Sequence, residues 1–320
     1  MERIVEFGSD ASGEAATGRL VGIVNRQEDA SAYQRPAALL FNAGIVHRIG
    51  PHRLNVKLAR ALAEVGVASI RFDLSGLGDS PPAPAGAAYE AQAALDISAA
   101  ADVLEADGAR TGFVAIGMCS GADNAYRAAL QDSRIIGLVL LDPYAYETPR
   151  AKVERALEKA RDIDRWKRAI GRTIGRDEET SAASSLDGGE DNDRVHPPVA
   201  EFGRDLEALA QRGVRVLIRY TTYVEELLTD PRHFHDAFKG FDFAGNLDVE
   251  VDRQSDHTYV RMSAQKRLFD HIAAWYEANW PRGAEAPAPP PREAGSAPDP
   301  APAPGAPIAG LRRAGVRPAR

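Results

Sequence analysis

The sequence predicts an α/β protein built on a mainly parallel sheet, and three observations support this fold class. Between about Ala37 and Val251, short apolar runs alternate with longer segments of helical periodicity, which is typical of parallel strands joined by helices. The chain has 320 residues, of which 44% are hydrophobic, so it can fill the core of one large domain. Glycine-rich turns follow two of the apolar runs, as expected at the carboxyl edge of such a sheet.

The first two strands are expected to pair antiparallel, because too few residues separate them for a crossover helix. They are Arg3–Phe7 and Leu20–Asn25. Strands and helices then alternate: strand Ala38–Phe41, helix His52–Val65, strand Ala68–Phe72, helix Tyr89–Leu104, strand Gly112–Ile116, helix Ala122–Leu130 and strand Ile136–Leu141. The pattern resumes later with helix Val199–Gln211, strand Val214–Tyr220, a short helix near His233–Phe238, strand Leu247–Val251 and helix Met262–Trp280. The sheet should therefore have about eight strands.

Two segments depart from this alternation. Residues 147–198 are first charged and helix-favouring, then acidic and rich in Ser and Gly, so we expect a lid insertion over the carboxyl edge of the sheet. Residues 281–320 consist mostly of Pro, Ala and Gly, a composition that buries too little apolar surface to offset ordering entropy. The sequence thus predicts one domain, residues 1–280, followed by a disordered tail.

Charge and cysteine content exclude several classes of protein. The formal net charge of -7 argues against nucleic acid or an anionic membrane as a general partner, since both require a basic face. The single cysteine, Cys119, leaves no internal disulfide and no multi-cysteine metal site. No stretch approaches the roughly 18 apolar residues of a membrane span. We expect a soluble, cytoplasmic protein, with its oligomeric state left open.

The strongest chemical signal is the pentapeptide Gly117–Gly121 (GMCSG), which lies between a predicted strand and a predicted helix. A nucleophile at such a junction takes a strained conformation, and the residues two before and two after it must be tiny. Only Cys119 has glycine at both of these positions, whereas Ser120 would have Met118 and Ala122. The alternative is a buried core cysteine without chemistry. The sequence favours Cys119 as a thiol nucleophile, with the following helix N-terminus favouring the thiolate.

A base and an acid should complete the site. His257 follows the last predicted strand and so lies at the same sheet edge as Cys119, where a general base is required. The acid that orients the imidazole is expected after strand Val214–Tyr220, which makes Glu225 the first candidate and Glu226 the second. Asp142, at the end of the preceding strand, is a competitor because that position reaches the same edge.

The loop after Phe41 should supply part of an oxyanion hole. The expected donors are the backbone amides of Ser120, Gly44 and Ile45, because small residues let a substrate oxygen approach the backbone. His47 and Arg48 follow and could bind an anionic substrate group, such as a carboxylate or a pantetheine phosphate. The alternative is that these basic residues are solvated or pair with Asp73 or Asp79.

Four motifs together resemble the α/β-hydrolase superfamily: Phe41–Gly44 (FNAG), Arg71–Ser80 (RFDLSGLGDS), the GMCSG elbow and Asp256–Thr258 (DHT). The likeness is closest to the bacterial serine-aminopeptidase-like or lysophospholipase-like hydrolases and covers roughly residues 3–280. The sequence departs from that pattern in two ways. Cys119 replaces the usual serine, as in enzymes similar to dienelactone hydrolases and polyhydroxyalkanoate synthases, and the usual Gly-x-x-Asp acid loop is missing after Tyr220.

Two functions remain as hypotheses. The first is hydrolysis or transfer of an acyl group from an ester or thioester, with acyl-CoA or carrier-protein thioesters as possible substrates, through an acyl-Cys119 intermediate and without a cofactor or metal. The second is a binding or scaffold protein that kept the fold and lost the chemistry, as the missing acid after Tyr220 suggests. The sequence does not distinguish water from another acyl acceptor.

Overall fold

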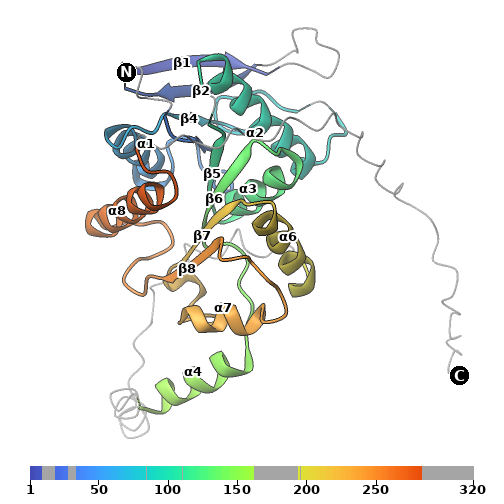
Figure 1. The fold of residues 1–320 in the computed structure, drawn as a ribbon, viewed down its shortest axis with the longest axis vertical. Coiled ribbons are helices and arrows are strands. Elements are labelled where there is room, and N and C mark those ends of the chain that lie inside the picture. The colour runs from blue at the N-terminus through green and yellow to red at the C-terminus, as the bar shows by residue number, and fades with distance from the viewer. Residues whose placement is uncertain are drawn as a thin grey trace, which may run out of the picture.

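Eight strands form one sheet in the order β1-β2-β4-β3-β5-β6-β7-β8 (Figure 1). The structure is a computed structural model and describes residues 1–8, 19–27, 34–83, 85–109, 111–161, 194 and 196–282. The strands are β1 (Glu2–Phe7), β2 (Leu20–Asn25), β3 (Ala37–Leu40), β4 (Ser69–Phe72), β5 (Phe113–Met118), β6 (Ile135–Leu141), β7 (Arg215–Tyr220) and β8 (Leu247–Val251). β2 pairs antiparallel with both β1 and β4, and all later pairs are parallel. The predicted fold class is confirmed.

Helices cover both faces of this sheet (Figure 1). On one face lie α2 (Tyr89–Ala106), α3 (Ser120–Gln131) and α6 (Val199–Gln211), with α7 (Pro231–Ala237) near the β8 end. On the other face lie α1 (Leu54–Glu64) and α8 (Met262–Asn279). Both faces of the central strands are therefore buried, which explains why their sequences read as continuous apolar runs.

Two boundaries differ from the prediction in ways that matter for the site. β5 continues to Met118 and α3 begins at Ser120, so Cys119 alone forms the junction between them. α1 begins at Leu54 rather than at His52, because His52 and Arg53 have φ values of 49° and 61° in a short 3-10 turn (Pro51–Arg53). Positive φ is incompatible with a right-handed helix, so the helix can start only after these residues.

The ends of the predicted lid are partly described. The insertion begins with α4 (Pro149–Arg161), which lies against α7 (Figure 1) and is joined to it by an ion pair between Arg150 and Asp236 at 2.8 Å. Arg194 and residues 196–198 form the described return of the chain toward α6. The remainder of the lid and the predicted tail from residue 283 onward lie outside the described residues. The lid and the domain limits therefore stay predictions.

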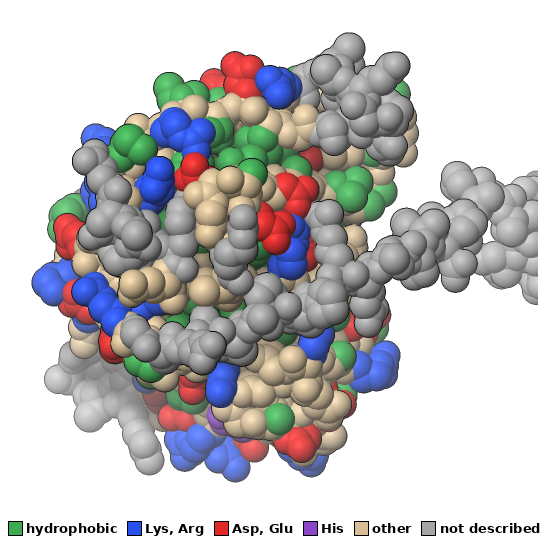
Figure 2. Space-filling model, turned by 45° about the horizontal axis from the view of Figure 1, so that its top comes forward, with side chains coloured by type: hydrophobic (Ala, Val, Ile, Leu, Met, Phe, Trp, Pro, Cys, Tyr) green, Lys and Arg blue, Asp and Glu red, His purple; other side chains and the backbone are tan. Residues whose placement is uncertain are grey.

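Two further observations concern membrane-spanning helices and the distribution of charge over the surface. Among the described residues, no helix combines the length and apolar character needed to cross a membrane. Figure 2 shows acidic and basic side chains interspersed over the face that it presents, rather than gathered by sign.

Candidate active site

Cys119 occupies a strained elbow at the carboxyl edge of the central strand β5. Its backbone has φ 54° and ψ −125°, a conformation that costs a non-glycine residue free energy. A Cβ at Gly117 would lie 2.1 Å from the carbonyl oxygen of Gly121, and a Cβ at Gly121 would lie 2.6 Å from that of Asn42. The two flanking glycines are thus required by close backbone contacts, as the sequence predicted. The thiol is partly exposed.

His257 lies beside the sulfur on the loop that follows β8. Its imidazole is hydrogen-bonded to Cys119, and its Nδ1 lies 2.7 Å from a carboxylate oxygen of Asp142. The ring of Tyr223 stacks on the imidazole at 3.9 Å between centroids and fixes its plane. Burial opposes the imidazolium charge, but the hydrogen bonds and charges of Asp142 and Cys119 outweigh it and raise the pKa of His257 to about 10. The site therefore favours the imidazolium form of His257 at neutral pH.

The carboxylate beside His257 belongs to Asp142, the third of the acids that the sequence left open, and not to Glu225, the first candidate. Asp142 follows β6 with φ 47°, and this turn directs its fully buried carboxylate toward the β8 loop. The amide and the hydroxyl of Thr221 each donate to that carboxylate at 2.7 Å. Glu225 and Glu226 are exposed at the end of a 3-10 turn (Thr222–Val224), and Glu226 lies 3.7 Å from a guanidinium nitrogen of Arg155. The loop after β7 thus holds the acid through Thr221 but does not supply it.

The predicted oxyanion loop lies directly against the elbow. Residues 43–46 form a tight turn in which Gly44 has φ 53°, and the amide of Gly44 donates to the hydroxyl of Ser120 at 2.8 Å. Ser120 is the first residue of α3, where backbone amides have no intrahelical acceptor. The structure thus brings Gly44 and Ser120 together. Ile45 is 76% exposed at the tip of the turn.

His47 and Arg48 pair with the acids of the neighbouring turn, which is the alternative to their predicted role in substrate binding. The guanidinium of Arg48 is buried, contacts Asp73, and lies 2.7 Å from Asp79 and 2.8 Å from the ring of His47. His47, Asp73 and Asp79 have the geometry of a possible metal cluster. However, Arg48 contacts all three of them, so its guanidinium fills the place that a cation would take.

Asp73 explains the glycine-rich turn Asp73–Ser80 that the sequence singled out. Its buried carboxylate accepts the side-chain amide of Asn42 at 2.8 Å and the backbone amide of Arg48 at 2.6 Å. A Cβ at Gly78 would lie 2.3 Å from the same carboxylate. This turn therefore holds the loop that carries Gly44, and its role is to position the candidate oxyanion hole.

Arg194 is a site residue that sequence reasoning missed. It lies just before α6, and its Nη1 is 4.0 Å from the sulfur of Cys119. Its guanidinium is paired with Asp123, with Nε at 2.8 Å and Nη2 at 2.6 Å from the two carboxylate oxygens. The available signal was Asp123 itself, a buried acid four residues after Cys119, because a buried carboxylate requires a cationic partner.

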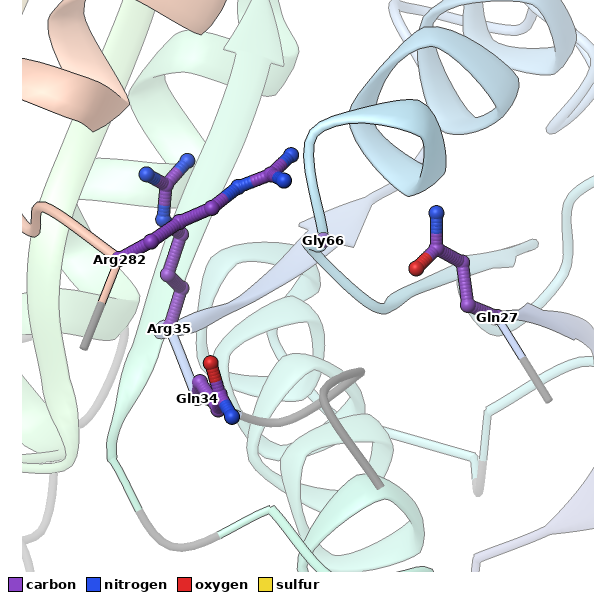
Figure 3. A pocket seen from close by; sticks show the side chains of 5 residues that line it. All are labelled: Gln27, Gln34, Arg35, Gly66 and Arg282. Atoms are coloured by element: carbon purple, nitrogen blue, oxygen red, sulfur yellow. The ribbon is translucent and has the colours of Figure 1, made fainter. Parts of the chain in front are cut away.

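Two cavities lie near the ends of the sheet. A small, mostly apolar cavity beside the elbow is lined by residues that include Ala43, Leu54 and Met118. Figure 3 shows a second cavity, lined by Gln27, Gln34, Arg35, Gly66 and Arg282. It lies near the amino ends of β3 and β4, opposite the edge that carries Cys119, and is not part of the candidate site.

Comparison with known proteins identifies the fold. Neither protein-family models nor curated protein sequences gave a match. Among solved structures, the chain is similar to an esterase domain of a Rhodothermus marinus protein, with 15% identity over 87% of this chain and 99% of that one and a TM-score of 0.52. It is also similar to the α/β hydrolase GrgF from Penicillium, with 14% identity over 88% of this chain and 99% of that one and a TM-score of 0.51.

A third solved structure, a hypothetical protein from Pseudomonas aeruginosa, has 18% identity over 87% of this chain and 94% of that one, with a TM-score of 0.53. The eight-stranded, mostly parallel sheet and these likenesses define the chain as a protein with the α/β-hydrolase fold. At this level of identity the comparison establishes the fold, and the chemistry must be argued from the site.

The raised pKa of His257 predicts how stability depends on pH. A group whose pKa is higher in the folded state binds more protons there, so its contribution is complete below about pH 6.5 and is lost as pH rises toward 10. We expect the difference in free energy of unfolding between wild type and His257→Gln to shrink over this range. Urea unfolding of both proteins at pH 6, 8 and 10 measures it, and a difference that stays constant or grows would contradict the assignment.

Proposed function

We propose that the protein hydrolyses or transfers the acyl group of an ester or thioester through a covalent acyl-thioester on Cys119. The observation that carries this proposal is the continuous set of contacts from Asp142 through His257 to a sulfur on a strained elbow. A nucleophile, a base in contact with it, and an acid that orients the base are the parts that acyl transfer requires.

The first half-reaction would acylate the sulfur. The thiolate of Cys119 attacks the carbonyl carbon, a carbon–sulfur bond forms, and the carbonyl oxygen becomes an oxyanion. The amides of Gly44 and Ser120 would receive that oxyanion once the Ser120 hydroxyl turns away from Gly44. His257 then gives its proton to the departing alcohol or thiol as the bond to it breaks, and Asp142 holds the imidazole throughout.

The second half-reaction would release the acyl group. Neutral His257 takes a proton from water, or from an alcohol or amine acceptor, which attacks the acyl-thioester. The second tetrahedral intermediate collapses, the carbon–sulfur bond breaks, and the thiolate–imidazolium pair is restored. Hydrolysis and transfer share every step except the identity of this acceptor. No metal or cofactor enters either half-reaction.

Two considerations support an ester or thioester substrate. The Rhodothermus neighbour is an esterase domain, which fits this reaction on the same fold. An alkoxide or thiolate also leaves more readily than an alkylamine, so esters and thioesters place the smaller demand on His257. An acyl-CoA or carrier-protein thioester belongs to this class, but Arg48 is engaged with Asp73 and does not present itself to a phosphate.

The alternative function, a non-catalytic binding or scaffold protein, was motivated by the missing acid after Tyr220. Asp142 supplies a carboxylate at the imidazole from β6 instead. The strained φ of Cys119 also argues for chemistry, because strain at one residue is retained where the side chain must be presented. Hydrolysis or transfer of an acyl group is therefore the function that we propose.

Substitution of the nucleophile tests the proposal. Cys119→Ala should lower turnover of nitrophenyl esters and short acyl-CoAs about 10³-fold or more, because no covalent intermediate can form. Cys119→Ser should retain only a small part of the activity. Each is assayed against wild type over a panel of acyl lengths, with circular dichroism to confirm folding. If both variants kept full esterase and thioesterase activity, the mechanism would be wrong.

A further inference from the structure

Arg194 is the charged group that the mechanism above leaves unused, although it lies at the nucleophile. Its side chain is only 9% exposed, and its guanidinium nitrogens contact polar atoms of Cys119 and Asp142. Nη1 lies 4.0 Å from the sulfur of Cys119 and 3.5 Å from the carbonyl oxygen of Asp142, while Nη2 lies 3.3 Å from the carbonyl oxygen of Cys119. The distance to the sulfur is within the range of an N–H···S hydrogen bond.

Two neighbours hold the guanidinium in this place. Asp123 binds it through both carboxylate oxygens, at 2.6 and 2.8 Å, and the ring of Tyr144 lies 4.6 Å from its central carbon. Bidentate pairing and stacking are the contacts that an arginine makes and a lysine does not. The position of Arg194 at the sulfur is therefore built by two side chains rather than left to a mobile surface residue.

The charges around the sulfur indicate why this arrangement exists. Asp123 is buried, and it belongs to the helix that begins directly after Cys119. An uncompensated carboxylate there would oppose negative charge on the sulfur. Asp142 adds a second buried negative charge, whereas His257 provides one cation and Arg194 the other. Burial opposes the charge of Arg194, but its bond to Asp123 and the charges of Asp123 and Cys119 keep its pKa above the ordinary value.

We propose that Arg194 is a second cationic partner of the Cys119 sulfur, which offsets the charge of Asp123 and, together with His257, gives the nucleophile positively charged surroundings. This inference rests on the proposed function, because it assigns a role at the same nucleophile. It also links the chain segment that enters α6 to the reactivity of the elbow. Without Arg194, His257 would be the one cation among the described residues left in contact with the sulfur, and the Asp123 charge would be offset there only by the partly exposed Arg127 on the same helix.

The test compares alkylation of Cys119 by iodoacetate, which is anionic, with alkylation by iodoacetamide, which is neutral and of similar size. In both reactions the sulfur forms a bond to the CH₂ carbon and iodide leaves. Cys119 is the only cysteine in the chain, so total alkylation reports on this site alone. The ratio of the two rate constants measures local charge, and a general loss of thiolate or a local distortion lowers both rates and cancels from the ratio.

Arg194→Gln should lower the iodoacetate-to-iodoacetamide ratio about fivefold or more, because a cation about 4 Å from the sulfur no longer attracts the anionic probe. Asp123→Asn should raise the ratio, since it leaves the guanidinium uncompensated. Arg194→Lys keeps the charge but loses the bidentate pairing and the stacking that hold it at the sulfur, so its ratio should lie between those of wild type and Arg194→Gln. The double variant Arg194→Gln/Asp123→Asn should lie between the two single variants. Opposite signs for the two single variants are an outcome that a purely structural role would not produce.

The outcomes separate this inference from the proposed function. If wild-type Cys119 reacts with neither reagent, the proposed thiolate mechanism fails. If wild-type Cys119 reacts but Arg194→Gln and Asp123→Asn leave the ratio unchanged, only the role of Arg194 is overturned. Should Arg194→Gln not fold, because Asp123 is left buried and unpaired, the Asp123→Asn variant decides, and a ratio that does not rise overturns the inference.

Discussion

Replacing Asp142 with asparagine is expected to lower kcat/KM for an ester or thioester substrate by about 10²-fold or more. Asparagine has nearly the same shape. Its Oδ1 can still accept the bond from the Thr221 amide, and its Nδ2 can donate to the Thr221 hydroxyl once that hydroxyl turns, so the fold should be kept. It carries no charge, however, and cannot hold the imidazolium of His257. The pKa of His257 should fall with it, since the hydrogen bond and charge of Asp142 are leading causes of its rise.

Matched controls are present in the same region of the sheet. Glu225→Gln and Glu226→Gln remove a charge from exposed side chains after β7 and should change kcat/KM by less than about twofold. If Glu225→Gln caused the larger loss, Asp142 would not be the orienting acid. The assignment would fail equally if Asp142→Asn kept wild-type activity while remaining folded.

Gly117→Ala is expected to destabilise the fold by about 3 kcal/mol or more. A Cβ there would lie 2.1 Å from the carbonyl oxygen and 2.3 Å from the carbonyl carbon of Gly121, and both are backbone atoms. No rotamer change relieves such a contact, so β5 and α3 would have to move apart. Because Cys119 lies between these elements, the nucleophile would be displaced and activity lost with the stability.

Gly240→Ala is the matched control for this substitution. A Cβ at Gly240 would meet no atom within 4 Å, so its effect on the free energy of unfolding should be within about 0.5 kcal/mol. Urea unfolding of both variants at one pH measures the difference. Equal stability of the two variants would show that the close crossing of β5 and α3 is not required.

The sequence was sufficient for the parts of the fold and site that local pattern determines. Continuous apolar runs predicted the buried parallel strands, and the spacing of Gly117 and Gly121 placed the elbow at Cys119 because the physical constraint acts on neighbouring residues. His257 could be chosen because the carboxyl ends of parallel strands meet at one edge, whatever their order in the sheet. Its contact with Cys119 follows from that topology.

The contacts that could not be predicted from the sequence depend on the conformation of single residues and on pairing across the fold. Asp142 reaches His257 because its own φ is 47° and because Thr221 fixes its carboxylate, and neither feature is visible in the residue pattern. Arg48 was expected to bind an anionic substrate group. It pairs with Asp73 instead, because the carboxylate of Asp73 is fully buried and requires a cation beside it. Arg194 lies at the end of an acidic, Ser/Gly-rich stretch, and its contacts with Asp123 and Tyr144 hold it at the sulfur.

A covalent acyl-Cys119 intermediate can be detected in the intact mass of the protein after brief incubation with a panel of acyl-CoAs and nitrophenyl esters. Wild type should gain the mass of one acyl group, located on the peptide that contains Cys119 and released by hydroxylamine. Cys119→Ala should show no such increase, and Asp142→Asn should accumulate it more slowly. Turnover of these substrates without an acylated Cys119, or the same adduct in Cys119→Ala, would contradict a covalent mechanism at this residue.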